Sequence, residues 1–364
     1  MIDLKQLLDV LAERNGSDLH LKVGAQPLIR VDGVLNRVGE EVVMPEDTQR
    51  IADEITPADR RERLHGLQEA DFAYSAPGIG RFRVNVYRQR GSLSIAMRRV
   101  RFGSPSFEEL GLPPVIRELS DSHRGLVLVT GPTGSGKTTT LAAMIDHINR
   151  SKSVHILTIE DPIEVLHKDD AAVVNQREIG VDTSDYLTAM RAAMREDPDV
   201  IFIGEMRDME TVAAALAAAE TGHFVLSTLH TIDATETVNR IVDFFPPYQQ
   251  HQIRVTLAGS LRGIICQRLV KRSGGGRIPS LEVCVNNGRV ADRIVDPAVT
   301  QEIEQIIGES GFYGMQTFDQ SLLGLVQNGL VAVEEAMGAA SRPHDFSLML
   351  EQAGIRTNTV PSGI

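Results

Sequence analysis

One loop constrains this chain more than any other segment. Gly131-Pro132-Thr133-Gly134-Ser135-Gly136-Lys137-Thr138 matches the pattern G-x-x-x-x-G-K-[ST], and Thr139 follows it. An apolar run, 126–129, precedes the loop and a segment of helical character, 139–149, follows it. Glycines there let backbone N–H groups surround phosphates at a helix N-terminus, where the helix dipole favours anions. We therefore expect a bound nucleotide, with Lys137 reaching its β- and γ-phosphates and the Thr138 hydroxyl ligating Mg²⁺.

Two other apolar runs end in carboxylates. Residues 199–205 read DVIFIGE, and we expect Glu205 to polarise or position the attacking water. The run 154–159 is followed by Glu160 and Asp161. Because the carboxyl ends of parallel strands face the ligand crevice, Glu160 is expected to hold Mg²⁺, directly or through water, or to orient the nucleophile. Asp161 fits a cap of the next turn equally well.

Histidines flank a fourth apolar run, 224–229. His230 follows the run and His223 precedes it. We expect His230 to sense the γ-phosphate and relay its state to a neighbour, and we assign His223 to nucleotide binding. The sequence lacks the Asn-Lys-x-Asp segment that guanine specificity normally needs, which favours ATP over GTP.

Charge and cysteine content exclude several classes of protein. With 37 basic and 49 acidic residues, the net charge is −12, so we expect no direct nucleic-acid partner. Cys266 and Cys284 are the only cysteines, which excludes a four-cysteine zinc site and fits a reducing compartment. No apolar run approaches the ~18–20 residues of a membrane span. We expect a soluble, cytoplasmic chain without a transmembrane segment.

The first hundred residues predict a small domain. Leu4, Leu7, Leu8 and Leu11 fall at helical spacing in the segment 1–11, and 45–67 predicts one charged helix. Residues 17–22 and 27–38 are typical of short strands, with Asp32-Gly33 as a hairpin turn.

Arginines follow one face of the two strands predicted within 80–100. Phe82, Val84 and Val86 alternate with polar residues, and so do Leu93, Ile95 and Met97. Arg81, Arg83 and Arg98 therefore line the polar face of a small antiparallel sheet.

Beyond the turn-rich segment 102–114 the pattern changes. Short apolar runs at 125–130, 153–159, 200–203 and 224–229 alternate with helical segments, which predicts a parallel α/β sheet. A hairpin tip is predicted at 273–276, and helices separated by glycines follow from about 296.

With these motifs assembled, the chain resembles the secretion-superfamily ATPases, and within them the PilT branch of type IV pilus retraction (twitching motility) motors. The matching segments are GPTGSGKTT (131–139), IEDPIE (159–164), GEMRDMET (204–211) and TGHFVLSTLHT (221–231). SDLHLKVGAQPLIRVDG (17–33) and GMQTFDQSL (314–322) extend the resemblance over nearly the whole chain.

The resemblance implies a PAS-like N-terminal domain over 1–101, a linker over 102–114 that would act as the hinge, and a RecA-like ATPase domain over 115–364. It also implies a ring of six chains that binds ATP between subunits, completed by arginines of the N-terminal domain. Arg81, Arg83 and Arg98 occupy the matching segment, and guanidinium groups stabilise charge on a transferring phosphoryl group. The implied partner is a membrane-embedded pilus platform protein, at the inner face of the cytoplasmic membrane.

One segment departs from the branch. The retraction signature AIRNLIRE is expected near 290–297, where this sequence reads VADRIVDP, and Pro297 would end a helix there. The absence of a four-cysteine zinc insertion and of a longer N-terminal region favours the retraction branch. The departure keeps open an assembly, type II secretion-like or DNA-uptake ATPase of the same superfamily. A nucleic-acid translocase on the same core is a more distant alternative, and a regulator that does not turn over ATP is another.

Overall fold

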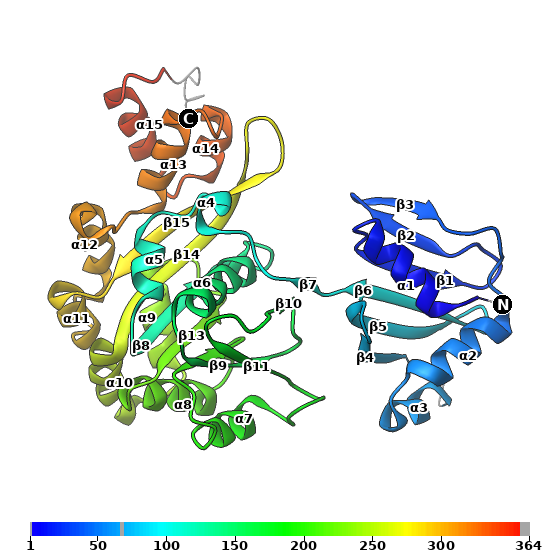
Figure 1. Ribbon diagram of the computed structural model, residues 1–364. Helices are drawn as coiled ribbons and strands as arrows, with labels where there is room; N and C mark the ends of the chain where they lie inside the picture. The colour runs from blue at the N-terminus through cyan, green and yellow to red at the C-terminus, as the bar shows by residue number, and fades with distance from the viewer. Residues whose placement is uncertain (1, 66–68, 357–364) are drawn as a thin grey trace. The chain divides into compact units, whose positions relative to one another are not determined.

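The computed structural model describes residues 2–65 and 69–356, which fall into two compact units, 1–101 and 102–364 (Figure 1). The predicted α/β class is confirmed, since the larger unit has a mostly parallel sheet between helices. No helix in the described part of the chain is long and apolar enough to cross a membrane.

The first unit is a six-stranded antiparallel sheet in the order β3-β2-β1-β6-β5-β4. Its strands are β1 (Asp18–Lys22), β2 (Leu28–Val31), β3 (Val34–Arg37), β4 (Ala70–Ala76), β5 (Gly80–Gln89) and β6 (Ser92–Arg99), and its helices are α1 (Leu4–Glu13), α2 (Pro45–Ile55) and α3 (Ala58–His65). The predicted turn at Asp32-Gly33 joins β2 to β3. Its φ angles of 49° and 82° fit a two-residue hairpin.

The two faces of this sheet differ as the alternation predicts. The apolar residues of β5 and β6 are buried together with all four leucines that define the predicted N-terminal helix. Arg83 and Arg98 lie on the other face, exposed and directly opposite each other on neighbouring strands. The first unit therefore has one apolar face covered by helices and one polar face.

The prediction of a single helix over 45–67 was wrong. Helix α2 ends at Ile55, Thr56 is extended with ψ of 124°, and α3 begins at Ala58. Pro57 explains the break, because a residue before proline is disfavoured in the helical conformation. The end of the predicted helix, at Leu67, lies outside the described residues.

The second unit contains a seven-stranded sheet in the order β11-β9-β12-β13-β8-β14-β15. These strands are β8 (Gly125–Thr130), β9 (His155–Glu160), β11 (Val173–Glu178), β12 (Val200–Ile203), β13 (Phe224–Leu229), β14 (Leu261–Lys271) and β15 (Arg277–Val285); the two-residue strands β7 (Arg101–Phe102) and β10 (Val165–Leu166) lie outside it. All neighbours are parallel except β14 and β15, which form a hairpin around the predicted tip. The predicted strands at 125–130, 200–203 and 224–229 are confirmed, and the one at 153–159 begins later, at His155.

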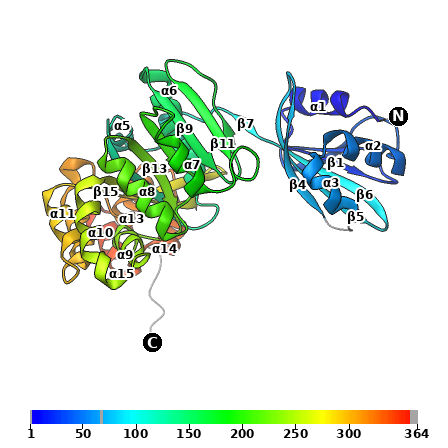
Figure 2. The same cartoon turned by 90° about the horizontal axis from the view of Figure 1, so that it is seen from below.

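Helices cover both faces of this sheet (Figure 2). They are α5 (Val115–Ser120), α6 (Lys137–Ser151), α7 (Tyr186–Ala193), α8 (Met209–Glu220), α9 (Ala234–Asp243) and α10 (Pro247–Ser260). Val127 and Val129 of β8 pack in one core with α5 and α6, whereas Leu126 and Leu128 pack in another with α7 and α8. The loop after β8 is thereby fixed at the carboxyl edge of a strand buried on both faces.

The predicted linker 102–114 is not free chain throughout. It contains α4 (Phe107–Leu110), and both Phe107 and Leu112 pack in the core with α5 and α6. From Phe107 onward this segment therefore packs in the core of the second unit.

Short helices follow the hairpin. They are α11 (Gly288–Val295), η1 (Thr300–Glu302), α12 (Ile303–Glu309), η2 (Gly311–Tyr313), α13 (Phe318–Gln327), α14 (Val333–Ala339) and α15 (Pro343–Gln352). Val270 and Ile278 of the hairpin share a core with α13, α14 and α15. The Arg268 guanidinium lies 3.9 Å from the centre of the Phe318 ring and donates to the Ala339 carbonyl at 3.2 Å. The last three helices are thus packed on β14 and β15.

Candidate functional site

The glycine-rich loop connects β8 to α6 with little space around it. Gly131 and Gly136 have φ angles of 140° and 92°, which side chains rarely adopt. A Cβ atom on Gly131 would lie 2.3 Å from the Gln267 carbonyl oxygen. These two positions require glycine, and they place Lys137 at the first position of α6.

The Lys137 ammonium group is held by its own loop. Its Nζ donates to the carbonyl oxygens of Gly131 at 2.7 Å and Pro132 at 3.2 Å, and lies 3.4 Å from His230 Nδ1. Burial lowers the pKa of Lys137 below its ordinary value, although Glu205 and Glu164 oppose that change. A phosphate entering the loop would offer this ammonium group stronger partners than the two carbonyls.

The predicted residues of the loop and of the strand ends meet around one crevice of about 490 Å³. The loop contributes Thr133, Gly134, Gly136, Lys137, Thr138 and Thr139. Glu160, Glu205 and His230 line it from the carboxyl ends of β9, β12 and β13. The residues of the loop that do not line the crevice support it, since Gly131 and Pro132 hold Lys137 and Ser135 is buried.

Both carboxylate oxygens of Glu205 are engaged. His230 Nε2 lies 3.2 Å from Oε1, and Arg207 contacts Oε2 at 2.8 Å through both Nε and Nη2. The Arg207 guanidinium also lies 3.6 Å from Asp161 Oδ2. A continuous polar chain therefore runs from Asp161 through Arg207, Glu205 and His230 to Lys137.

Glu160 is buried at the end of β9. Burial raises its pKa to about 7, against hydrogen bonds from Thr158 at 2.7 Å and Gln176 at 3.1 Å, which lower it. Glu160 and Thr138 line the same crevice. A carboxylate and a hydroxyl beside phosphate oxygens form the donor set that Mg²⁺ prefers, so these residues fit that ion.

His223 does not reach the crevice of its own chain. It precedes β13, whereas His230 follows it, so a strand of ~20 Å separates them. Its Nδ1 is 3.0 Å from the Ala218 carbonyl oxygen at the end of α8. Within one chain, the structure therefore gives no support to the assignment of His223 to nucleotide binding. Both histidines are adjacent to β13 in sequence, but the two ends of that strand lie far apart in space.

The three candidate arginines belong to the first unit and differ in their contacts. Arg98 Nε donates to Asp18 Oδ1 at 2.8 Å. Arg83 is exposed, and the Arg81 guanidinium lies 3.4 Å from the Ser75 hydroxyl. Arg98 therefore already has a carboxylate partner within its own unit.

Tyr186, Arg207, Leu269 and Arg277 are among the residues that line the crevice but were not predicted as site residues. Arg207 follows Glu205 closely in sequence, and that proximity was the one available signal. Tyr186 begins α7, and burial raises its pKa above the ordinary value, with Asp161 adding to that effect. No motif or spacing in the sequence points to Tyr186, Leu269 or Arg277 as part of a nucleotide site.

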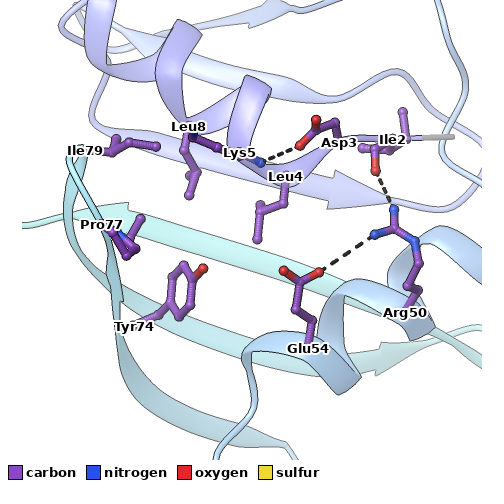
Figure 3. Close-up of a pocket in the computed structure, with 11 residues that line it drawn as sticks. Ile2, Asp3, Leu4, Lys5, Leu8, Arg50, Glu54, Tyr74, Pro77 and Ile79 are labelled. Carbon is purple, nitrogen blue, oxygen red and sulfur yellow. Dashed lines mark hydrogen bonds and ion pairs between the residues drawn. The ribbon is translucent and has the colours of Figure 1, made fainter.

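A second cavity, of about 650 Å³, lies in the first unit (Figure 3). Leu4, Leu8 and Ile79 contribute apolar surface, and Lys5 and Arg50 are its basic side chains. Arg50 contacts the Ile2 carbonyl and lies 3.8 Å from Glu54. This cavity is larger than the crevice but contains none of the predicted site residues, and its arginine is already paired.

Comparison with known proteins points to one family. A family model described as type II/IV secretion system protein matches residues 4–336. The type IV pilus retraction ATPase PilT of Pseudomonas aeruginosa is 43% identical over 95% of this chain and 100% of its own length. The type IV pilus ATPase PilU of the same organism is 38% identical over 96% of this chain and 92% of its own. A crystal structure of the pilus retraction motor PilT with bound ADP matches with a TM-score of 0.85 and 45% identity, over 95% of this chain and 99% of that one.

Proposed function

This chain belongs to the type II/IV secretion system protein family and is an ATP-hydrolysing enzyme, and we propose that it uses ATP to retract type IV pili. The observation that carries the proposal is the placement of Glu205 between His230 and Arg207, in the same crevice as Lys137. The proposed base would thus lie near the loop proposed to bind phosphate, with His230 between Glu205 and Lys137. The end-to-end similarity to a retraction ATPase supports the biological role.

In the proposed reaction, backbone N–H groups of the loop bind the phosphates of ATP, and Lys137 leaves its two carbonyl partners to contact the β- and γ-phosphates. Thr138 and Glu160 would hold Mg²⁺, which neutralises charge on the phosphate oxygens. Glu205 orients the attacking water and accepts its proton. His230, which contacts both Glu205 and Lys137, links the state of the γ-phosphate to the base.

The proposal includes an assembly. Six copies would form a ring in which Arg81, Arg83 or Arg98 of one copy completes the site of its neighbour. The ring would act in the cytoplasm on a platform protein embedded in the membrane. The net charge of −12 argues against direct contact with nucleic acid.

The segment 290–297 favours a second candidate, an assembly, secretion or DNA-uptake ATPase of the same family. Helix α11, which overlaps this segment, ends at Val295. The two arginines of that helix are paired, Arg289 Nη2 with Glu309 at 2.9 Å and Arg293 Nε with Glu302 at 2.7 Å. The similarity to the type IV pilus ATPase PilU is compatible with this candidate.

The test combines purified protein with a deletion strain. We expect ATPase activity that needs Mg²⁺ and coincides with a hexamer by mass, and loss of activity by at least about 100-fold in Glu205→Gln with ADP binding retained. Glu210→Gln, an exposed glutamate at the start of α8, is the matched control and should keep full activity. Equal activity in wild type and Glu205→Gln would show that the base is misassigned.

In cells, deletion should leave long, non-retracting pili and abolish surface motility, and only the wild-type gene should restore both. Short or missing pili in the deletion strain would instead support the assembly candidate. Stimulation of hydrolysis by DNA would support a nucleic-acid translocase.

A further inference from the structure

Gln267 is a buried side chain of β14 that contacts the nucleotide-binding loop without lining the crevice. It is 2% exposed. Its Nε2 donates to the Ser135 carbonyl oxygen at 2.7 Å, and its Oε1 accepts a hydrogen bond from the Thr140 hydroxyl at 2.7 Å. The amide orientation follows from chemistry, because a carbonyl oxygen can only accept. Gln267 thus joins the loop to the first turn of α6.

The hydrogen bond to the Ser135 carbonyl oxygen also determines where the N–H group of the same peptide, that of Gly136, points. A trans peptide is planar, so its C=O and N–H groups point in opposite directions. Since the Ser135 carbonyl points to Gln267, the N–H of Gly136 points away from Gln267. Gly136 lines the crevice and is the N-cap residue of α6, where N–H groups bind anions.

Close packing leaves this part of the loop little freedom to rotate. A Cβ atom on Gly136 would lie 2.6 Å from Gln267 Nε2, and one on Gly131 would lie 2.3 Å from the Gln267 carbonyl oxygen. The side chain and the backbone of one residue therefore contact both ends of the loop.

We propose that Gln267 is a positioning residue for phosphate binding, which fixes the 135–136 peptide so that the Gly136 N–H faces the bound phosphates. The proposal rests on the nucleotide binding proposed above for this crevice. Gln267 touches no phosphate itself. Its contribution is to hold a donor in place before the nucleotide arrives, which reduces the ordering cost of binding.

Gln267→Glu is the sharpest test, because it adds a titratable group at the same volume. When ionised, the new carboxylate presents an acceptor to the Ser135 carbonyl and repels it; when protonated, it can donate as the amide does. We expect the Kd for Mg-ADP, measured by calorimetry on the full chain, to rise about 10- to 100-fold at pH 8. The ratio to wild type at each pH should fall toward 1 as the pH is lowered to about 5.5.

Three other variants separate a loss of positioning from a non-specific effect of substitution on nucleotide affinity. Gln316→Glu is the matched control, because Gln316 Nε2 also donates to a backbone carbonyl, that of Leu281 at 3.0 Å, away from the crevice. Its Kd should equal that of wild type at every pH. Gln267→Met lacks the donor but carries no charge, so its Kd should rise about 10-fold without dependence on pH. Thr140→Val keeps the Ser135 contact and should change Kd less than threefold.

The outcomes distinguish the two proposals. If the wild type binds no nucleotide, the proposed function fails. If the wild type binds and Gln267→Met binds within twofold of it, the positioning role is wrong. Should Gln267→Glu fail to fold at pH 8, Gln267→Met and Thr140→Val still decide the question. Equal losses in Gln267→Glu and Gln316→Glu would also overturn it.

Discussion

His230 Nε2 lies 3.2 Å from Glu205 Oε1, across the carboxyl ends of the adjacent strands β13 and β12. The other ring nitrogen of His230 lies 3.4 Å from Lys137 Nζ. One imidazole therefore contacts both the proposed base and the lysine that is expected to bind the γ-phosphate. These two contacts would let the position of Glu205 respond when a phosphate binds beside Lys137.

The two histidines should behave differently when replaced. His230→Asn removes the link between Glu205 and Lys137, and we expect kcat to fall about 10- to 100-fold with ADP affinity within twofold of wild type. His223→Asn, at the other end of the same strand, should leave both quantities unchanged in a single chain. Steady-state ATPase assays and ADP titration check this. An equal loss of kcat in His223→Asn would mean that His223 acts on the site of another copy.

Arg207 should affect catalysis more than binding. Its Nε and Nη2 both contact Glu205 Oε2, so Arg207→Gln frees the carboxylate to leave its orientation. We expect kcat to fall about 10-fold, since orientation of a catalytic group contributes strongly to rate, with KM within twofold. Arg191→Gln, an exposed arginine of α7, is the control. A rise in KM at constant kcat would show instead that Arg207 binds the nucleotide.

Glu282 should make stability depend on pH. It is buried in β15, and burial is the main reason that its pKa is raised to about 7. Asp233 and Glu304 also raise this pKa. Arg268 and the Ala234 N–H, which donates to Glu282 Oε1 at 2.8 Å, lower it. A carboxyl with a raised folded pKa contributes stability below its ordinary pKa that is lost as pH rises through about 7.

Glu282→Gln removes this titration and keeps an acceptor for Ala234. Chemical denaturation should find the variant more stable than wild type at pH 8, by on the order of 2 to 3 kcal/mol, and equal to it near pH 4.5. A constant difference across this range would contradict the assignment.

Arg98 and Arg83 should differ in their effect on stability. Burial raises the pKa of Asp18, but hydrogen bonds from Ser17 and Arg98 outweigh it, and the net pKa lies below the ordinary value. Arg98→Ala should therefore lower the free energy of unfolding by about 1 kcal/mol. The loss should shrink as the pH falls and Asp18 is protonated.

Arg83→Ala removes a charge opposite Arg98 and should change stability by less than about 0.5 kcal/mol. Calorimetry of the full chain at two pH values measures both variants. Equal destabilisation by the two substitutions would show that Asp18 does not depend on Arg98.

Short-range patterns predicted much of the fold. The local signals are the glycines of the nucleotide-binding loop, the apolar strands before and after that loop, and the alternation within β5 and β6. The structure has each of these features. The break at Pro57 was also local, and was missed because the charged pattern continues on both sides of it.

Other features depend on contacts between distant segments. Strands β11 and β14 are edge and near-edge strands with mixed polar residues, such as Asn175 and Gln267, so their sequences lack a continuous apolar run. Gln267 reaches Ser135 across 132 positions of sequence. His223 and His230 show the opposite case, because they are close in sequence and far apart in space. The sequence therefore predicted the lining of the crevice by the loop, Glu160, Glu205 and His230 better than the contacts that hold the loop in place.

Adjacent residues of β14 face two different parts of the second unit. Gln267 holds the loop that is proposed to bind phosphate, and Arg268 stacks on Phe318 and donates to the Ala339 carbonyl. β14 is hydrogen-bonded to β8 on one side and to β15 on the other, which limits independent movement of these two residues. We therefore expect a displacement of the loop upon exchange of ATP for ADP to reach the terminal helices, where it would be measured as a change in amide hydrogen exchange in α13 and α14.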